Sequence, residues 1–178
     1  MKPLELRDEI VKLLYKHMKI PVILSDQAQP EVDPPFMIYS FVTPYSSTGE
    51  MGDISWTPDK PGYLLEGRTE MPSATLSFTV CSQNRVGKRG KEISGADEAE
   101  MLADKAVGYF KHVGYDDFAR LGICIVDVGP VGDRTTLMVD EASRRKGFDV
   151  RIRYTRTDIR KISTVESAAI TKKGVNDL

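Results

Sequence analysis

The order of two hydrophobic patterns along the chain limits its fold more than any other feature. Residues 4–18 repeat apolar side chains every third or fourth position, as an amphipathic helix does, and residues 94–112 do so again after a Ser-Gly-Ala-Asp start that resembles a capping box. The segments between and after them alternate or are wholly apolar, which predicts strands. Because strands and helices do not alternate regularly, we predict an α+β fold, a mainly antiparallel sheet with two principal helices packed on it, and not a doubly wound parallel sheet.

Six segments are predicted as strands, and a short helical turn is predicted near residues 115–122. The strands are residues 22–24, 36–43, 63–71, 73–81, 123–128 and 148–154. Segment 36–43 is apolar on both faces, so we expect a central strand that is covered on both sides. Segments 63–71 and 73–81 alternate, and we expect them to form an antiparallel hairpin that turns at Met71-Pro72.

Two polar segments, residues 44–62 and 82–95, are predicted as loops because they are rich in proline, glycine or polar side chains. Long loops in compact domains are usually functional. Trp56 lies in the first of them and is either a local anchor or an interface residue. The length of 178 residues fits one domain, here residues 1–163, followed by a loosely ordered tail at 164–178.

Catalytic and metal-binding motifs are absent from the sequence. There is no Cys-x-x-Cys, no histidine pair four residues apart and no G-x-S-x-G, and both histidines lie near predicted helix ends. Asp59, followed by Glu66-Gly67-Arg68, faintly resembles the Pro-Asp…Glu-x-Lys core of metal-dependent nucleases, with arginine in place of lysine. Ordinary surface charges explain these residues adequately, so we predict no enzyme, no metal and no cofactor.

The chain carries no signal for a membrane or for secretion. No apolar run approaches the roughly 18–20 residues of a membrane helix, and the first residues, Met-Lys-Pro-Leu-Glu, are charged. Cys81 and Cys124 are interpreted as reduced thiols in the core. We therefore expect synthesis in a cytosol and no membrane partner.

The charges are segregated, although the net charge is only −1. Residues 144–161 hold eight basic and two acidic residues, and residues 92–104 hold five acidic ones. Three interpretations remain open. The patches are two solvated faces, or the basic strand of one copy meets the acidic helix of the next in a head-to-tail contact, or Arg151 and Arg153 face the phosphates of DNA.

One stretch carries a resemblance to a known family. Ser-Asp-Gln-Ala-Gln-Pro at residues 25–30, Asp-Pro-Pro-Phe-Met-Ile-Tyr at 33–39 and Thr-Pro-Tyr at 43–45 follow an amphipathic helix. This arrangement resembles the phage neck terminator family, although Ser25-Asp26 stands where Gly-Asn is usual. The later order of hairpin, helix and a Phe-Asp-Val strand is similar to that family and to tail terminators generally.

The resemblance implies a structural virion protein of the neck or tail, made in the host cytoplasm. It implies a hexameric ring that caps the tail tube and joins it to the head connector or adaptor protein. The alternatives are another phage joint protein (a head-completion or tail-tube subunit) and a module that contacts passing genomic DNA. The expected oligomer-interface residues are Asp26, Gln27, Gln29, Pro34, Pro35, Trp56, Arg151 and Arg153. The expected lumen or docking residues are Arg85, Lys88, Arg89 and Lys91.

Overall fold

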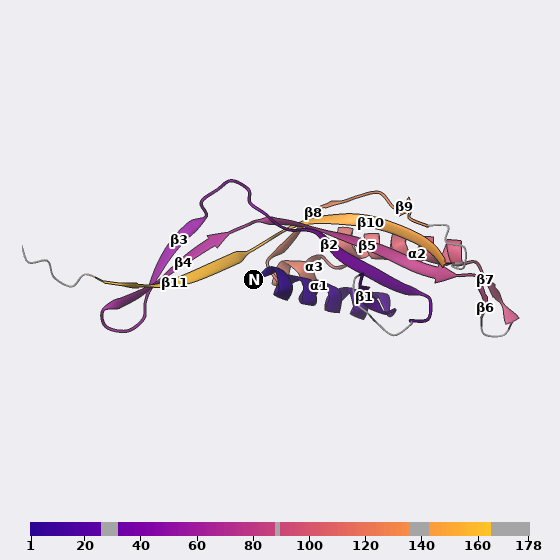
Figure 1. Ribbon diagram of the computed structural model, residues 1–178, viewed down its shortest axis with the longest axis horizontal. Coiled ribbons are helices and arrows are strands. Elements are labelled where there is room, and N and C mark those ends of the chain that lie inside the picture. Colours follow the sequence, from indigo (N-terminus) through magenta and orange to yellow (C-terminus); the bar gives the residue numbers. More distant parts are fainter. Residues whose placement is uncertain (26–31, 88–89, 136–142, 165–178) are drawn as a thin grey trace, which may run out of the picture. The chain divides into compact units, whose positions relative to one another are not determined.

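The computed structural model describes most of the chain, which divides into two compact units (Figure 1). The described residues are 1–25, 32–87, 90–135 and 143–164. The first unit comprises Met1–Glu50 and Met71–Arg156, and the second comprises Met51–Glu70 and the residues from Thr157 onward. The single domain over residues 1–163 stays a prediction. So does the loose tail at 164–178, of which residues 165–178 lie outside the described part.

The first unit is built on a six-stranded sheet of order β1-β2-β5-β10-β8, with β9 pairing with β10. Its strands are β1 (Val22–Leu24), β2 (Phe36–Ser46), β5 (Ser73–Gln83), β8 (Ile123–Val128), β9 (Gly132–Asp133) and β10 (Ser143–Tyr154). The pairing is parallel only between β1 and β2, among the described strands, and antiparallel elsewhere. A small hairpin of β6 (Arg85–Val86) and β7 (Glu92–Ile93) follows β5. The predicted α+β fold with a mainly antiparallel sheet is confirmed.

The helices are α1 (Pro3–Met18), α2 (Gly95–Gly108), the π-helical turn η2 (Tyr109–Val113) and α3 (Tyr115–Arg120). Pro3 suits the first turn, where its missing N–H is not needed, and the Glu5 carboxylate accepts a hydrogen bond from the Lys2 backbone N–H at 2.9 Å. Helix α1 ends at Met18, and the capping residue Lys19 that follows adopts the left-handed conformation. At the start of α2 the Ser94 hydroxyl accepts a hydrogen bond from the Asp97 N–H, so the predicted cap is confirmed.

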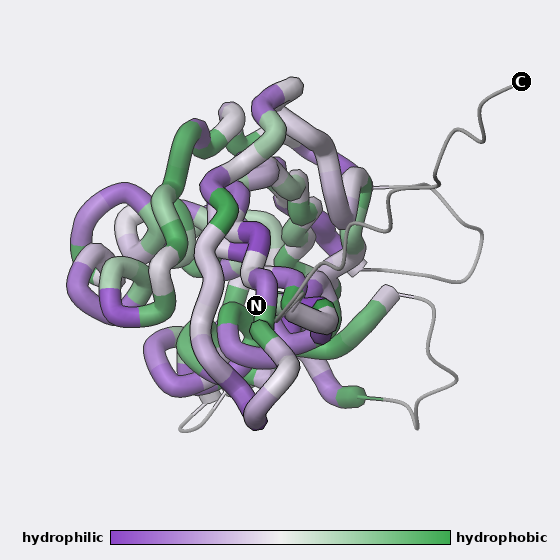
Figure 2. Tube along the Cα trace, turned by 90° about the vertical axis from the view of Figure 1, so that its left-hand side faces the viewer, coloured by the Kyte–Doolittle hydropathy of each residue, from purple (hydrophilic) through white to green (hydrophobic). Residues whose placement is uncertain are grey.

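The core lies between these helices and one face of the sheet. Every fourth residue of α1, from Leu6 to Met18, is buried there. An aromatic cluster fills the centre, with neighbouring ring centroids 5.1–6.2 Å apart, and it consists of Phe78, Tyr109, Phe110, Phe118 and Phe148. Figure 2 shows hydrophobic and hydrophilic residues interspersed along the traced chain, as expected of elements that bury one face only.

The second unit is a three-stranded sheet of order β11-β4-β3. Its strands are β3 (Asp53–Pro58), β4 (Tyr63–Glu70) and β11 (Arg156–Ser163), the last of which starts at the end of the first unit. Strands β3 and β4 form an antiparallel hairpin in which Trp56 faces Glu66 across the ladder.

Three predictions about strands were wrong. Strand β4 does not pair with β5, because β4 lies between β3 and β11 while β5 lies between β2 and β10. Segment 44–62 is not one long loop, since it holds the end of β2 and all of β3, and segment 82–95 holds β6 and β7. Alternation shows which face of a strand is wet, but it does not identify the neighbouring strand.

Two predictions about burial were also wrong. Strand β2 is not covered on both sides, because Met37 and Tyr39 are buried under the helices while Phe36 and Ile38 on the other face are half-buried. Cys81 is a buried free thiol as predicted, but Cys124 on β8 is exposed. Strand β8 is short and lies at the side of the sheet, so its outward positions remain open to solvent.

Candidate assembly surfaces

The face of the first sheet that points away from the helices carries hydroxyls and charges. Its central row comes from β5, where Thr75 and Ser77 alternate with buried apolar residues. Strand β10 contributes the predicted interface residues, with Arg151 opposite Thr75 and Arg153 opposite Ser73. Both arginines are exposed, and Arg151 lines a shallow hollow of about 220 Å³.

Arg134 lies across this open face, and sequence reasoning missed it. Its Nη1 donates to Ser77 Oγ at 2.6 Å and to Thr79 Oγ1 at 3.0 Å, and its Nη2 donates to Asp149 Oδ1 at 2.8 Å. A Cβ at Gly147 would lie 2.5 Å from Arg134 Cδ, so the glycine makes room for the arginine side chain. A glycine inside an alternating strand signals such a close approach, and Gly147 was the available clue.

The ion pair with Arg134 favours the ionised form of Asp149. Partial burial acts to raise the pKa of Asp149, but hydrogen bonds from Arg134 and Ser77 and the charge of Arg134 outweigh it, and the pKa is lowered. A carboxylate with a lowered pKa stabilises the fold above its unfolded pKa, and that contribution is lost as the pH falls through the lowered value.

We expect Arg134→Met to lower the free energy of unfolding by about 1–2 kcal/mol at neutral pH, because Asp149, Ser77 and Thr79 each lose a donor and the site is half open to water. The difference from wild type should shrink in acid, because the contribution of the Asp149 ion pair is lost as the pH falls through its lowered pKa. Urea unfolding at neutral and at acidic pH measures both effects. Arg151→Met is the matched control, because Arg151 lies on the same face of the sheet but is exposed. An equal loss in both variants would contradict the assignment.

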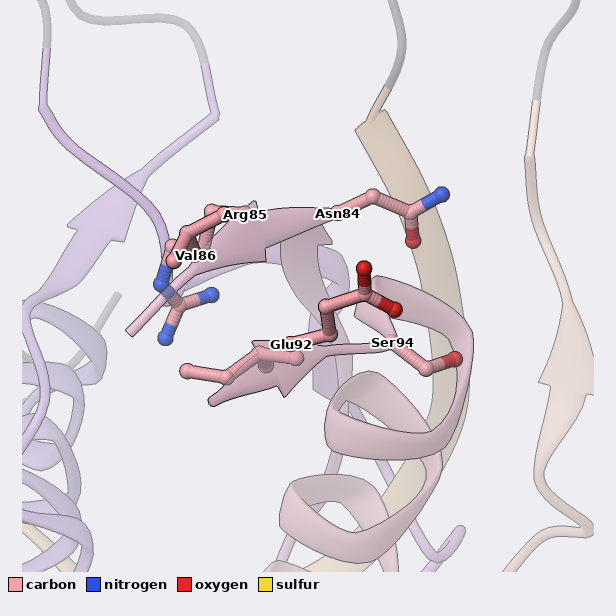
Figure 3. A pocket seen from close by; sticks show the side chains of 6 residues that line it. Asn84, Arg85, Val86, Glu92 and Ser94 are labelled. Carbon is pink, nitrogen blue, oxygen red and sulfur yellow. The ribbon is translucent and has the colours of Figure 1, made fainter. Parts of the chain in front are cut away.

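The hairpin of β6 and β7 borders a hollow of about 590 Å³ at the start of α2. Figure 3 shows Arg85 and Val86 projecting from one strand and Glu92 from the other, with Ser94 where the helix begins. The guanidinium of Arg85 is engaged by its own chain, since both of its terminal nitrogens donate to Glu98, at 2.6 and 2.8 Å. Hydrogen bonding from Arg85, opposed by burial, lowers the pKa of Glu98.

The four predicted docking residues therefore differ in their surroundings. Arg85 forms this internal ion pair and Lys91 is exposed at the hairpin, while Lys88 and Arg89 lie outside the described residues. Of the predicted interface residues, Pro34 and Pro35 are half-buried just before β2, and Asp26, Gln27 and Gln29 lie outside the described residues. The interface and docking roles of all of them stay predictions.

In the second unit, Trp56 stands 59% exposed on β3. Its Nε1 donates to Glu66 Oε2 at 3.2 Å, and Glu66 Oε1 accepts from Arg160 Nε at 2.5 Å. The hydrogen bond from Arg160 is the main reason that the pKa of Glu66 is lowered. Asp59, the other carboxylate of the nuclease-like pattern, pairs with Lys161 at 2.7 Å. The two carboxylates thus bind different basic residues of β11.

The large hydrophobic side chains of the second unit are mostly exposed. Five of them are 44–78% exposed, namely Met51, Ile54, Trp56, Tyr63 and Ile159. Among the described residues of the unit, only Gly67 and Glu70 are buried. Three-stranded sheets need a packed hydrophobic face for independent stability, which makes this sheet a candidate surface for packing against another protein.

Part of the predicted charge complementarity is satisfied within one copy. Glu100 on α2 lies 3.7 Å from Lys146 on β10, and Glu98 forms an ion pair with Arg85.

No group of three histidine, cysteine or acidic side chains in the described part of the chain is arranged to hold a metal ion. None of the described helices has the length and apolar character needed to cross a membrane.

A family model of phage neck terminator proteins matches residues 5–176, nearly the whole chain. The chain belongs to the phage neck terminator family. The resemblance noted at residues 25–45 is thereby confirmed. Membership gives the protein a structural role in the phage neck and implies contacts with other virion proteins, such as tail and head components. No curated protein matches the chain.

Proposed function

We propose that the protein forms a hexameric ring that caps the tail tube and joins it to the head connector. A structural neck protein has to bind copies of itself or its neighbours through matched surfaces, and membership in the family supports that role. Identical subunits that contact one another head to tail close into a ring when the rotation permits.

The observation that carries the proposal is the uncovered sheet of β3, β4 and β11. Its two outer strands differ, with β3 at one edge and β11 at the other. Exposed strand edges are templates for pairing with another chain, and two unlike edges suit a head-to-tail series of identical subunits. We therefore assign this sheet, with Trp56 at its β3 edge, to contact with the next subunit of the ring.

We expect Trp56→Ala to weaken ring assembly about tenfold or more, because tryptophan side chains concentrate binding free energy at interfaces. The subunit itself should stay folded, since the indole is already 59% exposed. Sedimentation of the purified protein, alone and with tail tubes, measures assembly, and circular dichroism monitors folding.

Leu4→Ala is the control for this variant, because Leu4 on α1 has a similar exposure of 64% but lies in the other unit. Unchanged assembly in Trp56→Ala would remove the indole from the interface. A wild-type protein that neither self-associates nor binds tube ends would contradict the ring itself.

A further inference from the structure

Helices α1 and α3 enclose a groove of about 480 Å³ in the first unit. Its floor is apolar where Leu13 and Leu121 are half-buried, and Tyr15 at its side is 58% exposed. A groove with an apolar floor and an exposed aromatic ring fits an amphipathic helix better than it fits solvent.

The rim of the groove is positively charged. Four cations line it, and two of them are matched locally, because Lys12 lies 3.7 Å from Glu9 and Arg120 pairs with Asp117. No carboxylate among the residues that the structure describes lies within salt-bridge distance of Lys16 or Lys19. The groove therefore presents two unmatched lysines beside its apolar floor.

The outer face of α2 is complementary to this groove. Met101 at its centre is 72% exposed, and Asp97 and Asp104 lie on the same face one turn to either side. Within the described portion of the chain, neither aspartate forms an ion pair. Methionine side chains are adaptable and are common at binding surfaces. An exposed methionine flanked by two unpaired aspartates is therefore better explained as part of a binding surface than as part of an ordinary solvent-exposed face.

The spacing of the two surfaces also matches. Lys12, Lys16 and Lys19 follow the pattern i, i+4, i+7, and Asp97, Met101 and Asp104 follow the same pattern. Each set spans about 10 Å along its helix axis, so two helices laid side by side would bring both aspartates within reach of lysines.

We propose that the α2 face of Asp97, Met101 and Asp104 docks into the α1–α3 groove of a second copy of this chain. The inference rests on the proposed ring and names one of its lateral contacts. Met101 enters between Tyr15 and the leucine floor opposite Lys16. One aspartate pairs with Lys19, and the other lies one turn away, where Lys16 and Lys12 can reach it. The two surfaces are different parts of one subunit, so the contact is head to tail. The receiving surface for the acidic helix is then the groove and not the basic strand β10.

Two charge-reversed variants test the contact. The groove variant carries Lys16→Glu with Lys19→Glu, and the helix variant carries Asp97→Lys with Asp104→Lys. Each alone should lose ring formation at least tenfold, because like charges then meet across every interface. An equimolar mixture should recover it, since alternating subunits pair opposite charges at every contact and a hexamer accommodates the alternation.

Cross-linking gives a second readout in a Cys124→Ser background. Mixing a Lys16→Cys chain with a Met101→Cys chain should yield a disulfide between the two chains, and neither chain alone should. Charge-reversed variants that stay folded but assemble like wild type, or a mixture that recovers nothing, would overturn the groove contact while leaving the ring intact. A wild-type protein that forms no ring on tail tubes would instead overturn the proposed function.

Discussion

Phe78→Ala is expected to lower the free energy of unfolding by about 3–5 kcal/mol, the largest loss among the substitutions considered. Phe78 is fully buried on β5, the strand paired on both sides along its length. Its ring centroid lies 5.1 Å from that of Phe110 and 5.8 Å from that of Phe148. Truncation therefore removes apolar burial, aromatic contacts and close packing between sheet and helices at once.

Urea-induced unfolding, followed by far-ultraviolet circular dichroism, measures this loss. Phe36→Ala is the matched control, because Phe36 lies on neighbouring β2 but on the opposite, half-buried face. It should lose clearly less stability than Phe78→Ala, in proportion to the smaller apolar area that it buries. Equal losses in the two variants would mean that the core does not lie on the helix side of the sheet.

The second large effect is expected from Gly95→Ala, which should destabilise the fold by about 2–3 kcal/mol through overpacking. A Cβ at this position would lie 2.6 Å and 2.8 Å from the carbonyl carbon and Cα of Gln83, and 2.9 Å from the Asn84 nitrogen. All three are backbone atoms, so the first turn of α2 or the end of β5 has to move. The hydrogen bond from the Gly95 N–H to Asn84 Oδ1, at 2.8 Å, would be strained as well.

Gly108→Ala is the control within the same helix. A Cβ there would have nothing within 4 Å, so the substitution should stabilise α2 by up to about 1 kcal/mol through helix propensity alone. Thermal unfolding of the two variants distinguishes the effects by sign. If both alanines stabilised the protein, close approach of Gly95 to β5 would not be a feature of the folded chain.

The sequence predicts those elements of the fold that bury one face. The three-and-four spacing of α1 and α2 and the apolar segment of β8 were sufficient to identify these elements, and each was found where it was predicted. Strand β3 is exposed on both faces and β11 is at most half-buried on one, so neither carries the apolar alternation that would have predicted a strand. The predicted pairing of β4 with β5 was wrong because the neighbour of a strand is set by packing of the whole chain, which local alternation does not encode.

The candidate surfaces were predicted less completely. Arg151, Arg153 and Trp56 were selected from residue type and position, and the structure places all three in solvent. Arg85 was selected in the same way, but Glu98, thirteen residues further on, already holds it. The groove was not foreseen because it joins residues about a hundred positions apart on α1 and α3. Such a surface exists only after folding, so no local sequence motif predicts it.

The β3–β4–β11 sheet buries few side chains, which has a consequence for the lifetime of free subunits. A segment with few buried apolar side chains opens at little free-energy cost, whereas the aromatic core of the first unit does not. In a lone subunit this sheet would open transiently and expose its backbone to proteases, and the proposed contacts with neighbouring subunits would keep it closed in a finished particle. Surplus copies would then be short-lived, and the incorporated ones would last as long as the virion.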